Sequence, residues 1–181
     1  KMITYLINLL TFARIIIAIV IFGLLTLDNY YIFALILFFI ASLSDYFDGF
    51  LARKYNATSQ IGEIMDPIAD KILIVFILLG LSVNLSSYLI GFVSACIISR
   101  EIWVSALRDM NARNNNIQAT KVIFLAKIKT SVQLFTISIY LLGLAMNNML
   151  IVVISDFFLV MSLFVTIYTG IIYTMNSFKH F

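Results

Sequence analysis

The sequence predicts an all-α integral membrane protein with six transmembrane helices and both termini in the cytoplasm. The first observation behind this prediction is composition: 62% of the 181 residues are hydrophobic and 12% are charged, whereas soluble domains carry about 25% charged residues. The second is the length of the uncharged segments, which suits helices of about 20 residues. The third is the alternation of basic and non-basic links along the chain. A chain of this size is expected to form a single transmembrane domain over residues 1–181.

The uncharged segments define the expected helices. Two of them, 72–99 and 130–155, are too long for one span. They are interrupted by Asn84-Leu85-Ser86-Ser87 and by Asn147-Asn148, so each is expected to contain the turn of a helical hairpin. Along the whole chain, helices are expected at 5–27, 31–52, 60–83, 87–109, 119–146 and 150–176.

Basic residues alternate between the two sides of the expected bundle. The links near 28–30, 84–87 and 147–149 contain no Lys or Arg. The other two links are basic, as are the ends of the chain. Because Lys and Arg favour the cytoplasmic side, both basic links and both termini are expected there. The protein is therefore expected in the cell (inner or plasma) membrane, with a site near these links facing the cytoplasm.

Composition also excludes several classes of function. The single cysteine, Cys96, excludes an internal disulfide and a cysteine-rich metal site. The single histidine, His180, lies beside the C-terminus, which argues against histidine catalysis. The formal net charge of +3 does not indicate a nucleic-acid partner.

Four aspartates gather in an otherwise apolar part of the chain. Asp45 and Asp48 are three residues apart near the end of the second expected helix, and Asp66 and Asp70 are four apart near the start of the third. Such spacings put each pair on one helix face. Because the short link makes the two helices an antiparallel hairpin, all four carboxylates are expected at one depth on the cytoplasmic side.

This cluster is expected to bind cations, since each ionised carboxylate in a bilayer costs about 3 kcal/mol or more. Hard oxygen donors suit Mg²⁺, Mn²⁺ or Ca²⁺. Four carboxylates can hold two such ions, the arrangement that clamps attacking and leaving oxygens in phosphoryl transfer. A divalent-cation channel or transporter would explain the charge equally well, but it would not explain the residues that follow the aspartates at fixed spacing.

Small residues share the helix faces of the aspartates. Gly49 follows Asp45 by four positions, Ala52 follows Gly49 by three, and Gly62 precedes Asp66 by four. They either leave space for a bulky ligand beside the metal site or serve helix packing alone.

Two further residues of the hairpin have two interpretations each. Arg53 either pairs with a phosphate or extends its charged end to the membrane surface. Pro67, the only proline, is either an early-turn residue or a kink in the third helix.

Together these residues form the pattern Asp45-x-x-Asp48-Gly49-x-x-Ala52-Arg53, eight residues, Gly62-x-x-x-Asp66-x-x-x-Asp70. This pattern resembles the complete motif of the CDP-alcohol phosphatidyltransferases. The resemblance implies a six-helix membrane enzyme, a homodimer, with two Mg²⁺ or Mn²⁺ ions held by the four aspartates. It also implies that Asp70 is the catalytic general base.

The resemblance further implies contacts to the donor, CDP-diacylglycerol. An Asn8-x-x-Thr11-x-x-Arg14 element is similar to a family element near the nucleotide, with Ile7 where the family usually has proline. The residues expected to contact the donor are Asn8, Thr11, Gly49, Arg53, Ser59 and Gly62.

A second stretch resembles the bacterial phosphatidylglycerophosphate synthases within this family. It consists of Arg100-Glu101-Ile102, Ser105-Ala106-Leu107-Arg108, and Lys127-Ile128-Lys129-Thr130 with Gln133, and has Ala126 where glycine is usual. The candidate ligands of an acceptor phosphate are Arg100, Arg108, Lys127 and Lys129. Taken singly, Arg100 could instead form a salt bridge to an aspartate or to Glu101, and the two lysines could contact only lipid headgroups.

The expected activity is transfer of the phosphatidyl group from CDP-diacylglycerol to sn-glycerol 3-phosphate, giving phosphatidylglycerol phosphate and CMP. The alternatives are a transferase of the same family with another acceptor, such as inositol phosphate or phosphatidylglycerol, and the divalent-cation transporter.

Overall fold

The computed structural model describes residues 2–27, 29–55, 60–113 and 124–178, and within them it contains six helices and no strand. The helices are α1 (Met2–Leu25), α2 (Tyr31–Tyr55), α3 (Gln60–Asn84), α4 (Tyr88–Arg113), α6 (Phe124–Ala145) and α7 (Met149–Phe178).

The all-α prediction is confirmed, and the expected helices differ from these mainly at their ends. α2 and α4 continue past their expected ends to Tyr55 and Arg113, so the basic residues near these ends are part of the helices. The expected start of the fifth helix at residue 119 lies outside the described residues. The described helix α6 begins at Phe124. Pro67 lies inside α3, beyond its first turn, so it is not an early-turn residue. It leaves one backbone hydrogen bond of α3 unmade.

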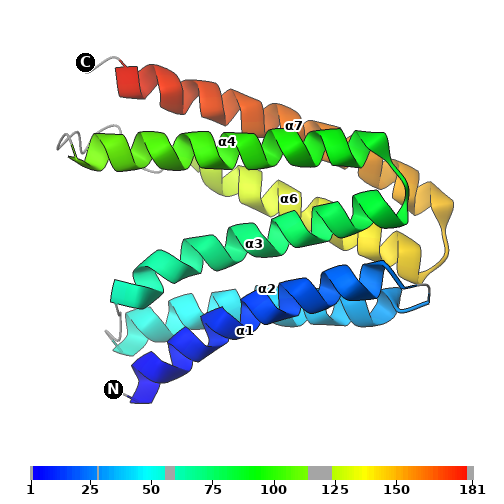
Figure 1. Ribbon diagram of the computed structural model, residues 1–181, viewed down its shortest axis with the longest axis horizontal. Coiled ribbons are helices and arrows are strands. Elements are labelled where there is room, and N and C mark those ends of the chain that lie inside the picture. Colours follow the sequence, from blue (N-terminus) through cyan, green and yellow to red (C-terminus); the bar gives the residue numbers. More distant parts are fainter. Residues whose placement is uncertain (1, 28, 56–59, 114–123, 179–181) are drawn as a thin grey trace.

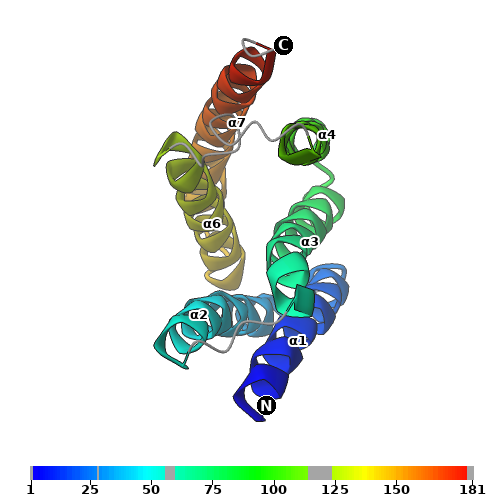
Figure 2. The same cartoon turned by 90° about the vertical axis from the view of Figure 1, so that its left-hand side faces the viewer.

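The six helices form a ring. Neighbouring helices around it pack in the order α1, α3, α4, α7, α6, α2 and back to α1, and α3 also contacts α6 across the ring. Figure 2 shows this arrangement end-on. The start of α1 and the end of α7 lie at the same end of the bundle, where α2 and α4 also end (Figure 1).

Two of the tight connections at the opposite end of the bundle have the same backbone conformation. Ser86 and Asn147 adopt positive φ angles of 46° and 49°. The following residues donate back into the preceding helices, Ser87 N–H to Ser82 O at 3.1 Å and Asn148 N–H to Gly143 O at 2.9 Å. This is the left-handed helix ending that terminates a helix sharply, and it confirms both turns expected from the sequence.

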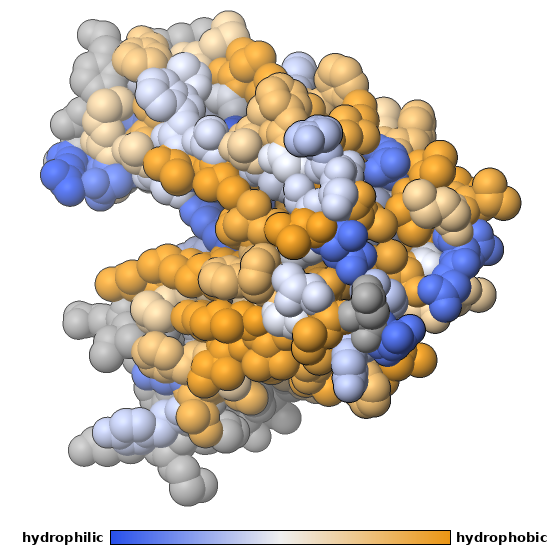
Figure 3. Space-filling model, turned by 45° about the vertical axis from the view of Figure 1, so that its right-hand side comes forward, coloured by the Kyte–Doolittle hydropathy of each residue, from blue (hydrophilic) through white to orange (hydrophobic). Residues whose placement is uncertain are grey.

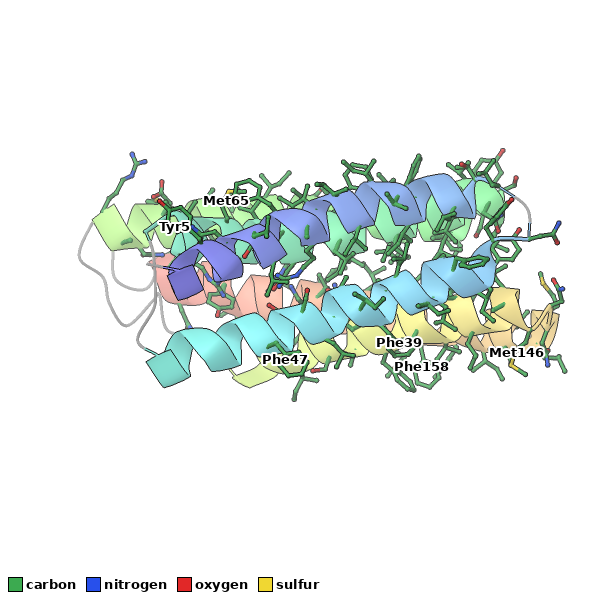
Figure 4. All side chains as sticks on the ribbon, turned by 90° about the horizontal axis from the view of Figure 1, so that it is seen from below. Tyr5, Phe39, Phe47, Met65, Met146 and Phe158 are labelled. Carbon is green, nitrogen blue, oxygen red and sulfur yellow. The ribbon has the colours of Figure 1, made fainter. Side chains whose placement is uncertain are left out.

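Apolar and polar side chains are distributed over the bundle as in a membrane protein. Large apolar side chains such as Phe39 and Phe47 point outward from α2 (Figure 4) and are about half exposed, at 49% and 52%. The face drawn in Figure 3 is largely apolar. Polar residues including Arg14, Lys129 and Gln133 are buried instead. Among the described helices, α1, α4, α6 and α7 are long and apolar enough to cross a membrane.

Candidate functional site

Arg14 of α1 joins two of the predicted metal ligands. Its Nη1 donates to Asp70 Oδ1 of α3 at 2.8 Å and lies 3.4 Å from Asp45 Oδ1 of α2. The arginine side chain is fully buried, whereas the two carboxylates remain 40% and 51% exposed. One guanidinium nitrogen therefore brings together carboxylates from both helices of the aspartate hairpin, as the sequence predicted for Asp45 and Asp70.

Thr11, one helical turn before Arg14, contacts Asp66, the third aspartate of the motif whose side chain is described. Its hydroxyl donates to Asp66 Oδ1 at 2.6 Å. Thr11 and Arg14 are both buried on the face of α1 that packs against α3. This face of α1 thus orients Asp66 and Asp70, which lie on consecutive turns of α3.

The donor set at this end suits hard divalent cations, since carboxylate oxygens are the ligands that Mg²⁺ and Mn²⁺ prefer. Within the described residues, no three acidic, histidine or cysteine side chains form a metal cluster by themselves. Asp48 lies in α2, but its side chain is outside the description. Among the residues that the structure describes here, Asp45 and Asp70 share the guanidinium of Arg14, which fits a place where cationic charge is needed.

A cavity of about 390 Å³ begins at Asp70 and extends between α3, α4 and α6. Lys71 of α3, Glu101 and Arg108 of α4, and Lys129 of α6 are charged residues in its wall. Arg100 is a further charged residue of the lining, and Ser105, Thr130 and Gln133 are uncharged polar ones. The cavity therefore joins the last aspartate of the motif to three of the four cations predicted to bind an acceptor phosphate.

Arg100 is anchored to the protein through all three of its nitrogen atoms. Nε donates to Thr166 O at 3.1 Å, Nη2 donates to Thr169 Oγ1 at 2.8 Å, and Nη1 contacts Glu101 Oε1 at 3.0 Å. A Cβ added at Gly170 would lie 3.1 Å from the arginine side chain, so this glycine lets α7 approach it closely. The salt bridge to Glu101 that the sequence left open is therefore present.

Glu101 is the shared counter-ion of the cavity. Its Oε1 accepts a hydrogen bond from Lys129 Nζ as well as from Arg100, and its Oε2 lies 4.0 Å from Lys71 Nζ. Three basic side chains from three helices thus surround one carboxylate that is only 17% exposed. Burial of this carboxylate is offset by the attached cations.

Arg108 differs from Arg100 in having a buried donor to spare. Its Nη2 donates to Tyr173 OH at 2.9 Å, and its guanidinium carbon lies 4.9 Å from the centre of the same ring. Its Nε is buried and makes no hydrogen bond within the described part of the chain. An unsatisfied buried donor costs about 1–3 kcal/mol, so Arg108 is well suited to receive an anionic ligand.

The other predicted donor contacts are less fully described. Asn8 lies on α1 one turn before Thr11, and Gly62 is buried in α3 one turn before Asp66. Gly49 and Arg53 lie in α2, but their surroundings are outside the description, as is Ser59 altogether. The side chain of Lys127 in α6, a predicted ligand of the acceptor phosphate, is also outside the description.

Lys71, Arg14, Glu101 and Ser105 belong to the site but were absent from the sequence-based site list. Lys71 follows Asp70 directly, and an ionisable residue within an apolar helix is the signal that could have indicated it. Arg14 was identified only as part of the element that begins at Asn8, and nothing in its spacing indicates the contacts with Asp45 and Asp70.

Comparison with known proteins agrees with the motif. The family model for CDP-alcohol phosphatidyltransferases matches residues 4–169. Several curated relatives carry the name CDP-diacylglycerol–glycerol-3-phosphate 3-phosphatidyltransferase. The protein from Rickettsia felis is 36% identical over 179 residues, covering 96% of each chain.

Two other relatives of that name align over shorter segments. The protein from Blochmanniella floridana is 44% identical over 102 residues, covering 56% of this chain and 54% of its own length. The protein from Escherichia coli strain K12 is 33% identical over 105 residues, covering 58% of each. The family match spans the aspartate motif, the cavity and most of all six helices, and the chain therefore belongs to the CDP-alcohol phosphatidyltransferase family.

Proposed function

We propose that the protein transfers the phosphatidyl group of CDP-diacylglycerol to sn-glycerol 3-phosphate, releasing CMP and forming phosphatidylglycerol phosphate. The family match and the names of the relatives support this reaction. The observation that carries it is the cavity, in which Asp70 and the basic residues Arg100, Arg108 and Lys129 line one space of about 390 Å³. A small molecule with a hydroxyl at one end and a phosphate at the other matches that distribution of groups.

The acceptor hydroxyl is activated by Asp70. Its carboxylate takes the proton, and the hydroxyl oxygen attacks the phosphorus that carries diacylglycerol. A new P–O bond forms there as the P–O bond to CMP breaks, so that CMP leaves with the electron pair of that bond. Arg14 holds one oxygen of Asp70, which orients the carboxylate and leaves its other oxygen for the proton.

The four aspartates, Asp45, Asp48, Asp66 and Asp70, would hold two divalent cations, Mg²⁺ or Mn²⁺. When bound, such ions neutralise charge on the diphosphate of the donor. Thr11 and Arg14 orient Asp66 and Asp70 from α1. Asn8, Thr11, Gly49, Arg53, Ser59 and Gly62 are proposed to contact the donor, and Arg100, Arg108, Lys127 and Lys129 the acceptor phosphate.

The membrane arrangement that goes with this chemistry has six spans and both termini in the cytoplasm of the cell. Basic residues beside α2, α4 and α6 favour that side, where water-soluble acceptors and CMP are available. We also propose that two copies of the chain form a homodimer, as the family resemblance implies.

Acceptor selection is the test of this function. Purified protein is given CDP-diacylglycerol, Mg²⁺ and, in separate reactions, sn-glycerol 3-phosphate, inositol phosphate or phosphatidylglycerol, and CMP release is measured. We expect release with glycerol 3-phosphate. Release with inositol phosphate or phosphatidylglycerol alone would identify another acceptor, and ion flux in liposomes without CMP release would identify a transporter.

Replacement of the proposed base separates catalysis from binding. Asp70→Asn is expected to lower kcat by about 10²- to 10⁴-fold, because the amide cannot take the acceptor proton, while thermal unfolding remains cooperative. Asp156→Asn is the control, since Asp156 accepts a hydrogen bond from Tyr140 away from the cavity, and it should retain activity. Wild-type turnover by Asp70→Asn would contradict the assignment.

Replacement of Arg14 tests the charge balance of the aspartates. In Arg14→Met, Asp45 and Asp70 lose the cation between them, so the metal-free protein is expected to unfold at a lower temperature. Added Mg²⁺ or Mn²⁺ should raise the unfolding temperature more in this variant than in the wild type, since the metal replaces the missing charge.

Arg113→Met is the matched control for the Arg14 variant. Arg113 pairs with Asp109 at the exposed end of α4, and its loss should change neither unfolding temperature nor metal response. Equal metal-induced shifts in Arg14→Met and wild type would show that the guanidinium and the metal do not share these carboxylates.

A further inference from the structure

Lys71 is the basic residue of the cavity to which the mechanism above assigns no role. It follows Asp70 on α3, and its side chain lies opposite Glu101 and Ser105 of α4. A lysine among apolar helices is costly and by default faces a cavity or a partner. The contacts and exposure of Lys71, compared with those of the other cations, indicate that it faces the cavity.

Two of the other cations are held closely by the protein. Each nitrogen of Arg100 donates to an acceptor on α4 or α7. Lys129 is bound to Glu101 and its side chain is 8% exposed. These two residues supply positive charge to the cavity, but their side chains are only 9% and 8% exposed, so a ligand reaches them less easily than it reaches Lys71.

Lys71 retains donors for a ligand. Its Nζ donates to Ser105 Oγ at 2.6 Å, and its distance of 4.0 Å from Glu101 Oε2 is too long for a hydrogen bond. An ammonium has three N–H groups, and this side chain is 39% exposed. Lys71 is thus more exposed than Arg100 and Lys129, and Arg108 has a buried Nε without a hydrogen-bond partner in the described part of the chain.

The charge around Glu101 also suits a phosphate. Lys71, Arg100 and Lys129 surround this single carboxylate, so the group has a formal net charge of plus two. A phosphate monoester carries about two negative charges near neutral pH. Glu101 thus holds the three cations close together while leaving an excess of positive charge that such a ligand neutralises.

We propose that Lys71 is a further ligand of the acceptor phosphate and that Ser105 and Glu101 position its ammonium. The inference rests on the proposed function, because it requires an acceptor that carries a phosphate. Asp70 and Lys71 are consecutive residues that line the same cavity. The base and the phosphate ligand would therefore hold the two ends of one small acceptor.

The donor is a second source of phosphate near Lys71. This lysine also lines an apolar groove of about 370 Å³ between α3 and α4, together with Ile72, Phe76 and Ile102. We assign Lys71 to the acceptor because Arg108, whose buried Nε has no hydrogen-bond partner among the described residues, lines the cavity and is absent from the groove. Separate KM values for the two substrates distinguish the sources.

The test is the steady-state kinetics of Lys71→Met, which keeps the length of the side chain and removes its charge. We expect KM for sn-glycerol 3-phosphate to rise about 10- to 100-fold, the loss typical of a hydrogen bond to a charged group. KM for CDP-diacylglycerol and kcat at saturating acceptor should stay within about threefold. Lys71→Arg should restore most of the acceptor affinity.

Ser105→Ala tests the positioning part of the inference. It removes the hydrogen bond to Lys71 and leaves the charge in place, so KM for the acceptor should rise about threefold. Arg113→Met, which removes an exposed cation from the end of α4, should leave both KM values unchanged.

Three results would overturn the inference. One is an unchanged acceptor KM in Lys71→Met. Another is a rise in the donor KM instead, which would make Lys71 a ligand of the donor phosphate. The third is a loss of kcat and unfolding temperature in Lys71→Met with both KM values unchanged, which would make Lys71 a structural residue.

Inorganic phosphate gives a readout that does not depend on activity. It should raise the unfolding temperature of the wild type and of Arg113→Met, but not that of Lys71→Met. If the wild type shows this shift yet does not use glycerol 3-phosphate, the proposed function fails while the phosphate site stands. If the wild type uses glycerol 3-phosphate and phosphate stabilises Lys71→Met equally, the function stands and the role of Lys71 fails.

Discussion

A buried guanidinium requires counter-charge, and Arg14 finds it in carboxylates from two other helices. Its contacts with Asp45 and Asp70 hold α1, α2 and α3 together at the aspartate motif. Removing one partner of a buried ion pair typically costs about 3–5 kcal/mol, and the partial exposure of both aspartates lowers that figure here. Both carboxylates remain partly exposed while they contact Arg14, and a site for cationic ligands needs such accessible carboxylates.

The second charged centre uses the opposite arrangement. At Arg14 one cation serves two carboxylates, whereas at Glu101 one carboxylate serves three cations. α3 connects the two, because Asp70 belongs to the first centre and Lys71 to the second. The aspartate end therefore suits metal ions with the donor diphosphate, and the cavity beyond it suits an anionic acceptor. On the proposed function, the two substrates would lie beside each other because consecutive residues of α3 belong to the two centres.

Much of this could be predicted from the sequence, because helix periodicity and membrane thickness are local constraints. The uncharged segments predicted the helices, and the spacing of Asp66 and Asp70 predicted their common face. Which helices pack together is not a local property. Arg14 and Asp70 are 56 positions apart, and Glu101 and Lys129 are 28 apart. The sequence offered a salt bridge between Arg100 and Glu101 as one alternative, but it did not indicate that Glu101 would also gather Lys71 and Lys129 from two other helices.

The central claim is that one cavity brings the acceptor hydroxyl to Asp70, so that it attacks the donor phosphorus directly. The most direct measurement is exchange of radiolabelled CMP into CDP-diacylglycerol with acceptor omitted. Direct transfer predicts no incorporation of label, because the bond to CMP breaks only as the acceptor oxygen attacks. Incorporation at a rate comparable to turnover would contradict the account, since it would require a phosphatidyl group held covalently on a protein side chain such as Asp70 or Ser105.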